Sequence, residues 1–300
     1  MERKDQIDTF GAIALSGFAL FLAFNQVVIK VTNEGLQPVF FAGVRSAGAA
    51  LCLWAYLRWR NVSLRIDRDV AIAGIIAGFF FGAQFLCLFI ALDLTTVGRS
   101  GVIFYSMPVW LALIAHWVMP NDRITVIKAV GLAFAVGGVA WAMLDRSTAG
   151  DASLWGDLAA LGGAMSWAIG AMVAKASPLS RARPEIQLLI QLVVSAPILL
   201  CAAVFFGPFI RELGPLHVAG LLFQIVVVVS AGFVVWLWLL SVYPASGVAS
   251  FSFLSPVQSV GLGWALLGET VGLELIGALV LVAIGIILIN RPVKSRKTSA

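Results

Sequence analysis

The chain has 300 residues, of which 61% are hydrophobic and only 12% are charged, and its formal net charge is +5. A soluble domain carries about 25% charged residues, so this composition excludes an ordinary water-soluble globule, which could not cover its surface with polar groups. The net positive charge does not indicate nucleic-acid binding, because the basic residues cluster in loops beside long apolar blocks, a pattern typical of membrane topology.

Apolar blocks of about 20 residues follow one another along the chain, and a block of this length can cross the hydrocarbon core as a helix. Short polar breaks such as 33–35 and 268–270 separate them. Strands are not expected, because a membrane barrel needs short segments of alternating polarity. The sequence therefore predicts an all-α integral membrane protein with ten transmembrane helices, at 10–31, 37–57, 70–91, 97–118, 123–143, 154–176, 185–207, 216–239, 246–267 and 271–290.

An even number of crossings places both termini on one side of the membrane. Most loop arginines and lysines fall on that same side, including Arg3, Lys4, the arginines of 58–68 and the basic residues of 291–297. Because positively charged loops remain in the cytoplasm, we expect a multi-pass protein of the bacterial inner membrane with both termini cytoplasmic.

The two halves of the chain resemble each other. Residues 10–30 align with 155–175 at a shift of 145, Gly74 matches Gly220 at a shift of 146, and Pro108 matches Pro256 at a shift of 148. Small loop insertions would give this drift. The pattern predicts one repeat at 1–147 and a second at 148–300. Five helices per repeat is an odd number, so the copies are expected to be inverted, as in many alternating-access transporters.

Polar and aromatic side chains near mid-depth are the first candidates for a substrate site, because polar groups in hydrocarbon are costly unless they face a partner or a cavity. An interhelical hydrogen bond is the alternative for each of them. Trp110 and Trp167 lie too deep for an interfacial belt and could wall a cavity. The candidates by depth are Asn25, Gln84, Tyr105, Trp110, Trp167, Ser252 and Gln258.

For other residues the sequence predicts gating or structural roles. Pro108 and Pro256 break helices at matched positions, either as simple kinks or as pointers to a central site. Gly74, Gly78 and Gly82 share one helix face, which favours close packing or, alternatively, a sliding contact. Arg45 is a strong charge well inside a helix with no acid at its depth. A structural anchor and a contact to an anionic substrate are both open for it.

The sequence contains no catalytic or cofactor-binding pattern that we can identify. Gly-x-x-x-x-Gly-Lys-[Ser/Thr] does not occur, so no P-loop is expected. His116 and His217 fall at opposite membrane faces, and the cysteines at 52, 87 and 201 show no metal or disulfide spacing. We therefore expect no enzyme activity, no cofactor and no metal site.

The arrangement of ten helices as five plus five, Arg45 in the second helix, the prolines at 108 and 256, and Leu-Gly-Glu-Thr at 267–270 resemble the drug/metabolite transporter superfamily, in particular its EamA-type branch. Met-Pro-Asn-Asp at 119–122 departs from the Leu-Gly-Glu pattern expected in the first repeat. Within the branch the chain is most similar to the YddG-type aromatic amino-acid exporters.

This resemblance implies a central cavity lined by helices 1, 3, 4, 6, 8 and 9, alternating access, and export of amino acids, aromatic ones included, or related metabolites. It implies substrate contacts by Asn25, Gln84, Tyr105, Trp167, Trp236 and Ser252. By its position alone Trp236 falls near a helix end, where an interfacial belt residue is the alternative. The expected partners are a small-molecule substrate and the lipid bilayer, without nucleic acid, and the expected state is a monomer. A nucleotide-sugar or phosphate-ester carrier, which would need several cations in its cavity, and a non-transport membrane enzyme or scaffold are the alternatives.

Overall fold

The structure, a computed structural model, describes residues 7–119, 123–144, 152–243 and 251–290. Within these ranges the chain forms helices joined by short connections, with one isolated bridge between Leu36 and Ile210. Eight helical segments are long and apolar enough to span a membrane, and two shorter apolar helices follow them. The predicted all-α membrane fold is confirmed.

The first half begins with Asp8, whose side chain accepts a hydrogen bond from Gly11 N (2.8 Å) and so caps the first helix. Gln37 caps the second helix, with Pro38 in its first turn. The helices of this half are α1 (Thr9–Gly35), α2 (Pro38–Trp59), α3 (Arg68–Leu94), α4 (Val97–Phe104), α5 (Met107–Val118) and α6 (Val126–Leu144).

The second half contains more irregular helical segments. Its elements are α7 (Leu154–Ala176), the 3-10 turn η1 (Pro178–Arg181), α8 (Pro184–Ala203), α9 (Pro215–Leu222), the π-helix η2 (Phe223–Ala231), α10 (Gly232–Val242), the 3-10 turn η3 (Phe251–Phe253), α12 (Leu254–Leu267) and α13 (Leu273–Ile289). Two of the predicted spans are irregular inside, and a third lies partly outside the described residues. The helix expected at 97–118 is interrupted at Tyr105 and Ser106, next to Pro108, which lies in the first turn of α5. The helix expected at 216–239 contains η2, and the helix expected at 246–267 falls partly outside the described residues.

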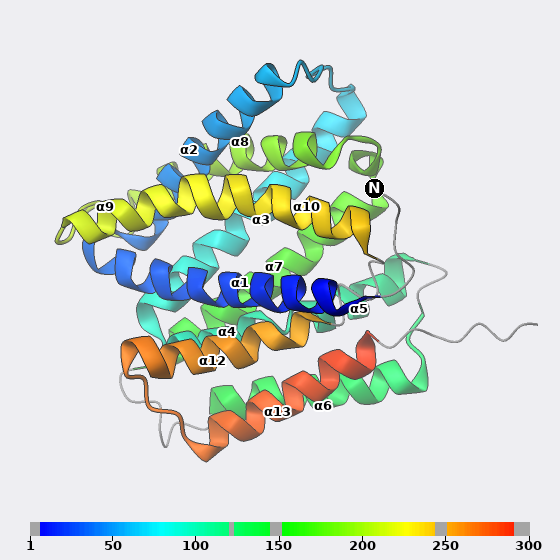
Figure 1. Cartoon of the computed structure of the whole chain (residues 1–300), viewed down its shortest axis with the longest axis vertical. Helices are drawn as coiled ribbons and strands as arrows, with labels where there is room; N and C mark the ends of the chain where they lie inside the picture. The colour runs from blue at the N-terminus through cyan, green and yellow to red at the C-terminus, as the bar shows by residue number, and fades with distance from the viewer. Residues whose placement is uncertain (1–6, 120–122, 145–151, 244–250, 291–300) are drawn as a thin grey trace, which may run out of the picture.

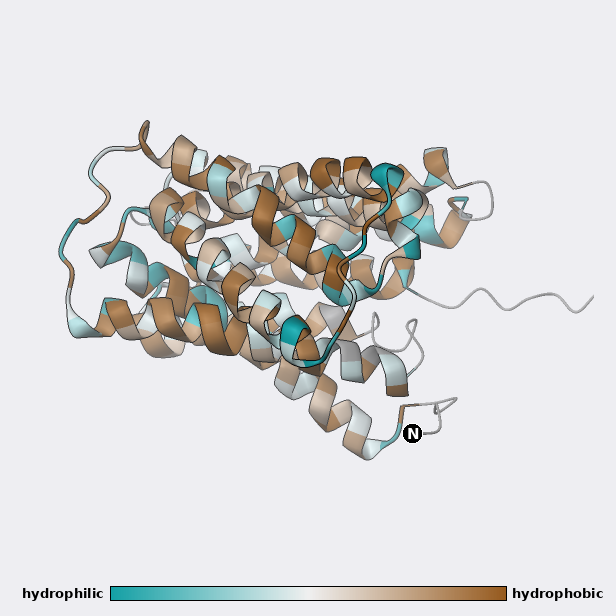
Figure 2. Cartoon of the chain, turned by 90° about the horizontal axis from the view of Figure 1, so that it is seen from above, coloured by the Kyte–Doolittle hydropathy of each residue, from teal (hydrophilic) through white to brown (hydrophobic). Residues whose placement is uncertain are grey.

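The helices run antiparallel, so the molecule has two ends (Figure 1). We call the end that holds residues 9, 59, 68, 118, 176, 242 and 289 the terminal end, and the end that holds 35, 94, 97, 154, 203 and 269 the far end. Figure 2 shows apolar colour along the helices and hydrophilic colour mainly at the connecting segments. This distribution matches helices embedded in a bilayer.

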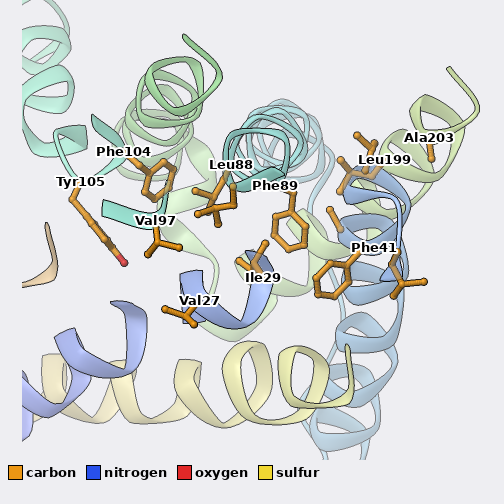
Figure 3. Packing of buried hydrophobic residues seen from close by; sticks show 14 residues of the cluster. Val27, Ile29, Phe41, Leu88, Phe89, Val97, Phe104, Tyr105, Leu199 and Ala203 are labelled. Atoms are coloured by element: carbon orange, nitrogen blue, oxygen red, sulfur yellow. The ribbon is translucent and has the colours of Figure 1, made fainter. Parts of the chain in front are cut away.

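Helix α3 lies at the centre, between α7 and α8. Its glycines allow close approach: a Cβ added at Gly74 would lie 2.7 Å from Ile190 Cγ2, and one at Gly78 would lie 2.6 Å from Val194 Cβ. An alanine at either position would therefore force Ile190 or Val194 on α8 to shift. Figure 3 shows the neighbouring core, in which Phe41 on α2 meets Phe89 on α3 edge to face at 4.9 Å between ring centroids. The packed helices leave a central space on the other side of α3.

Candidate functional site

A cavity of about 500 Å³ lies between α1, α2, α3, α4–α5, α7, α8 and α10. Its lining extends from mid-depth residues such as Gln26 and Phe104 to Leu15, Leu188 and Asn290, which lie toward the terminal end. The volume is within the range of small-molecule sites. The cavity therefore reaches from the middle of the membrane toward one end of the molecule.

The deep part of the cavity is polar. Arg45, Asn25, Gln26 and Gln84 line it, and all four side chains are buried. Asn25 Oδ1 accepts a hydrogen bond from Gln224 Nε2 on the π-helix, whereas Nε2 and Oε1 of Gln26 have no hydrogen-bond partner among the described residues. Buried amides without partners carry a desolvation cost. They are therefore available to a polar ligand.

Arg45 is the one charged residue among the described residues that line the cavity. It is 1% exposed, and its Nε and Nη2 atoms have no hydrogen-bond partner within the described part of the chain. The guanidinium carbon lies 3.7 Å from the ring centroid of Phe85 and 5.2 Å from that of Phe89. Cation–π contacts of this kind offset part of the cost of burying the charge, but they leave its N–H groups free to donate.

The rest of the wall is largely aromatic. Trp236 on α10 stacks on Phe18 of α1, with 5.4 Å between ring centroids and 21° between ring planes. Trp167 lines the opposite part of the wall from α7, where it is half-buried. Tyr105 comes from the break between α4 and α5, where it lines the cavity and is buried beside the core shown in Figure 3. Such rings bind apolar groups through contact area and stacking.

Five of the predicted substrate-contact residues line this one cavity: Asn25, Gln84, Tyr105, Trp167 and Trp236. Two others do not line it. Trp110 donates a hydrogen bond from Nε1 to Ser106 Oγ (3.0 Å), and Gln258 lies in a shallow groove between α1 and α12, where Nε2 donates to Ser16 O (3.3 Å). The side chain of Ser252 is outside the described residues.

The residues with predicted gating or structural roles are dispersed. Pro108 and Arg45 line the cavity, and Pro256 lies in the first turn of α12 next to the lining residue Ser255. Gly74, Gly78 and Gly82 all face α8 and lie outside the cavity lining. The structure also brings the second and seventh of the ten predicted helices, α2 and α8, to the cavity, and the resemblance did not include these two.

The far end is closed by a set of polar contacts that we call the far-end network. Arg99 on α4 pairs with Asp157 on α7, with Nη2 2.7 Å from Oδ2, and both side chains are buried. The Glu269 carboxylate accepts hydrogen bonds from Val97 N (2.6 Å) and Gly98 N (2.9 Å) at the start of α4. An acid at a helix N-terminus is favourable because it compensates the free N–H groups.

Further contacts tie the same end to α3. Lys30 Nζ donates to Leu92 O (3.2 Å) and Thr95 O (2.7 Å), and Asn33 Nδ2 donates to Phe89 O (2.9 Å). Arg211 forms a bidentate pair with Asp93, at 2.6 Å and 2.9 Å, and this interaction raises the pKa of Arg211. These bonds join α1 and the 204–214 connection to the end of α3.

The described residues also form polar contacts at the terminal end. Arg181 pairs with Asp69 at the surface, and Tyr243 Oη donates to Asp8 Oδ1 (2.9 Å). The cavity lining reaches this end through Asn290 and Phe251. The two ends thus differ: polar bonds close the far end, and the cavity approaches the terminal end.

Arg99, Asp157 and Gln224 are not among the residues that the sequence singled out, and Glu269 entered only as part of the Leu-Gly-Glu-Thr stretch at 267–270. The signal for Arg99 and Asp157 was that the topology assigns both to the same membrane face, each adjoining an apolar helix. For Gln224 the signal was an amide within an apolar run, the same criterion that selected Gln84. Within the described residues no cluster of His, Cys, Asp and Glu could hold a metal ion.

A family model described as "EamA-like transporter family" matches this chain twice, at residues 9–144 and 154–291. The chain is 28% identical to the uncharacterized transporter YvbV of Bacillus subtilis (strain 168), with 96% of this chain and 94% of that protein covered. It is 25% identical to the uncharacterized inner membrane transporter YedA of Escherichia coli (strain K12), with 90% and 86% covered. Among the solved structures, a crystal structure of a protein matches with a TM-score of 0.64 at 19% identity, over 94% of this chain and 98% of that chain. This last likeness shows the fold alone.

Proposed function

Since the chain belongs to the EamA-like transporter family, we propose that it exports amino acids, aromatic ones included, or related small metabolites by alternating access. The observation that carries the proposal is the aromatic wall of the cavity, formed around a buried polar end. An amino-acid side chain would contact Trp167, Trp236 and Phe18, and the polar backbone groups would lie near Asn25 and Gln84. The proposed site thus offers apolar area together with a few convergent polar groups, as small-molecule sites do.

The difference between the two ends supports alternating access. If both termini lie in the cytoplasm, the cavity approaches the cytoplasmic side while the far-end network closes the outer side. Transport would then require the bonds of Arg99, Lys30 and Glu269 to break while the terminal end closes. Two inverted halves, 1–147 and 148–300, would supply the two gates.

Arg45 disfavours the nucleotide-sugar or phosphate-ester alternative. A phosphate ester or a diphosphate carries about two negative charges or more. A carrier of such a substrate needs several cationic side chains in its cavity to pair with these charges. Among the described lining residues, Arg45 is the single cation, while Lys30, Arg99 and Arg211 are bonded in the far-end network. The cavity does not support the alternative of an enzyme, because the described residues of its wall bring together no nucleophile, base and orienting group.

Counterflow in proteoliposomes tests the proposal. Vesicles loaded with unlabelled substrate are diluted into labelled phenylalanine, tryptophan, leucine, lysine, aspartate or a nucleotide sugar. We expect transient accumulation of the apolar and aromatic amino acids and no signal for the nucleotide sugar. Accumulation of the nucleotide sugar alone would support the alternative carrier. Empty vesicles and vesicles with heat-inactivated protein are the controls.

A further inference from the structure

The deep end of the cavity holds a positive charge that no acid of the described lining neutralises. Arg45 is 1% exposed, and the described residues that line the cavity include no Asp or Glu. An arginine stays charged in proteins at neutral pH, and a buried charge without a partner is costly. The two phenylalanine rings near the guanidinium offset only part of that cost.

The neighbouring polar groups are neutral. Asn25 is bonded to Gln224, and Gln26 keeps both of its amide atoms without a partner among the described residues. A ligand ammonium group would find neutral amide oxygens here and a repelling guanidinium. A carboxylate would find the only full charge of opposite sign in the described lining.

We propose that Arg45 binds the carboxylate of the transported molecule, and that the cargo is selected as an apolar or aromatic monocarboxylate whose amino group is dispensable. A guanidinium presents N–H groups in a fork that matches the two oxygens of a carboxylate. The aromatic residues Phe18, Trp167 and Trp236 then contact the apolar body. This inference rests on the proposed transport function and narrows it to one required chemical group.

The competing role for Arg45 is a packing anchor that holds α2 against α3 through Phe85 and Phe89. The two roles predict opposite effects on stability. A guanidinium kept for a ligand costs stability in the empty protein, so Arg45→Met, which keeps an unbranched apolar stem and removes the charge, should raise the melting temperature. If Arg45 is an anchor, the same substitution should lower it.

Binding to the purified protein, measured by calorimetry, separates this inference from the proposed function, because it requires no transport. The probes are phenylalanine, 3-phenylpropionate and its neutral isostere 3-phenylpropionamide, and the variants are Arg45→Met, Arg45→Lys and Trp155→Ala, the last at an exposed position of α7 outside the cavity. We expect the two carboxylates to bind the wild type with similar Kd values. Loss of charge-assisted hydrogen bonds should weaken the amide by about ten- to hundredfold.

Arg45→Met should weaken both carboxylates to the level of the amide and leave the amide unchanged. Arg45→Lys should retain part of the affinity for the carboxylates. This variant keeps the test informative if Arg45→Met does not fold. Trp155→Ala should bind as the wild type does. Equal binding of acid and amide, unchanged carboxylate binding in Arg45→Met, or no binding of either carboxylate to the wild type would overturn the inference. If the carboxylates bind as expected but counterflow is absent, the proposed function fails and the binding assignment stands.

Discussion

Arg99 on α4 and Asp157 on α7 form a buried ion pair at the far end, with 2.7 Å between Nη2 and Oδ2. Asp157 also accepts a hydrogen bond from Thr95 Oγ1 (2.8 Å), and Arg99 donates to Ala142 O. One pair therefore links the start of α4, the end of α3, α6 and α7. Its loss should affect the closure of the far end more than the loss of a surface pair would.

Asp157→Asn should destabilise the protein and open the far end. Removing one partner of a buried pair leaves an uncompensated charge, at a cost of about 3–5 kcal/mol. Ser100 is fully buried on α4, so a cysteine at this position reports opening. In detergent, Ser100→Cys should react faster with a maleimide in the Asp157→Asn background. Asp69→Asn, which breaks the exposed pair with Arg181, is the matched control and should change little. Equal reaction rates in all three backgrounds would exclude this pair as part of the closure.

The orientation of the chain can be measured directly. Glu34 and Glu212 are exposed at the far end, and Ser63 is exposed at the terminal end. With Cys52, Cys87 and Cys201 replaced by serine, we expect cysteines at Glu34 and Glu212 to react with a membrane-impermeant reagent added to whole cells. A cysteine at Ser63 should react only after the cells are opened. The reverse pattern would place both termini outside and would invert the assignment of the two gates.

Trp167→Ala should weaken transport without unfolding the protein. The ring forms part of the cavity wall, and an aromatic contact contributes about 0.5–1.5 kcal/mol beyond its area. We therefore expect the half-saturation concentration for phenylalanine to rise by up to roughly tenfold in counterflow. Trp155→Ala, a substitution at an exposed tryptophan of the same helix, serves as the control. Unchanged transport in Trp167→Ala would assign this residue to packing.

Exchange should proceed without a proton gradient. Proton-driven carriers usually hold Asp, Glu or His in the membrane interior, and the described lining of this cavity includes none of them. In proteoliposomes, we expect counterflow at equal pH on both sides and no uphill accumulation when a pH gradient is imposed. Strong accumulation driven by that gradient would contradict this prediction. It would direct attention to Asp157, Glu269 and His116.

The apolar segments were enough to predict the helices, and the position of a polar or aromatic residue within its segment was enough to predict part of the cavity wall. Asn25, Gln84 and Trp167 lie at mid-depth in their helices, and all three line the cavity. Depth does not give the rotation of a helix about its axis, however. Trp110 lies as deep as Trp167 but bonds to Ser106 outside the cavity, and Gln258 faces a groove beside α1.

Neighbour relationships could not be predicted from the sequence. The ion pair of Arg99 with Asp157 and the bonds of Glu269 to α4 depend on which helix ends adjoin, and ten antiparallel helices can be arranged in many ways. The partners of Lys30 are backbone carbonyls at the end of α3, which carry no signal in the side-chain pattern. A single sequence therefore predicts candidate residues, but it does not predict which of them bond to one another across helices.

The π-helix at Phe223–Ala231 bears on how the two halves are compared with each other. A π turn accommodates an extra residue inside a helix, and each residue added to an α-helix rotates the remainder of that helix by about 100°. The spacing between Gly74 and Gly220 is 146, whereas that between Pro108 and Pro256 is 148, and the π-helix lies between Gly220 and Pro256. The difference between the spacings of 146 and 148 can therefore arise partly inside a membrane helix, at the π-helix, and not only from a change in loop length. An ungapped superposition of the predicted copies would differ in helix rotation before and after the π-helix, so the two halves have to be compared separately on each side of Phe223–Ala231.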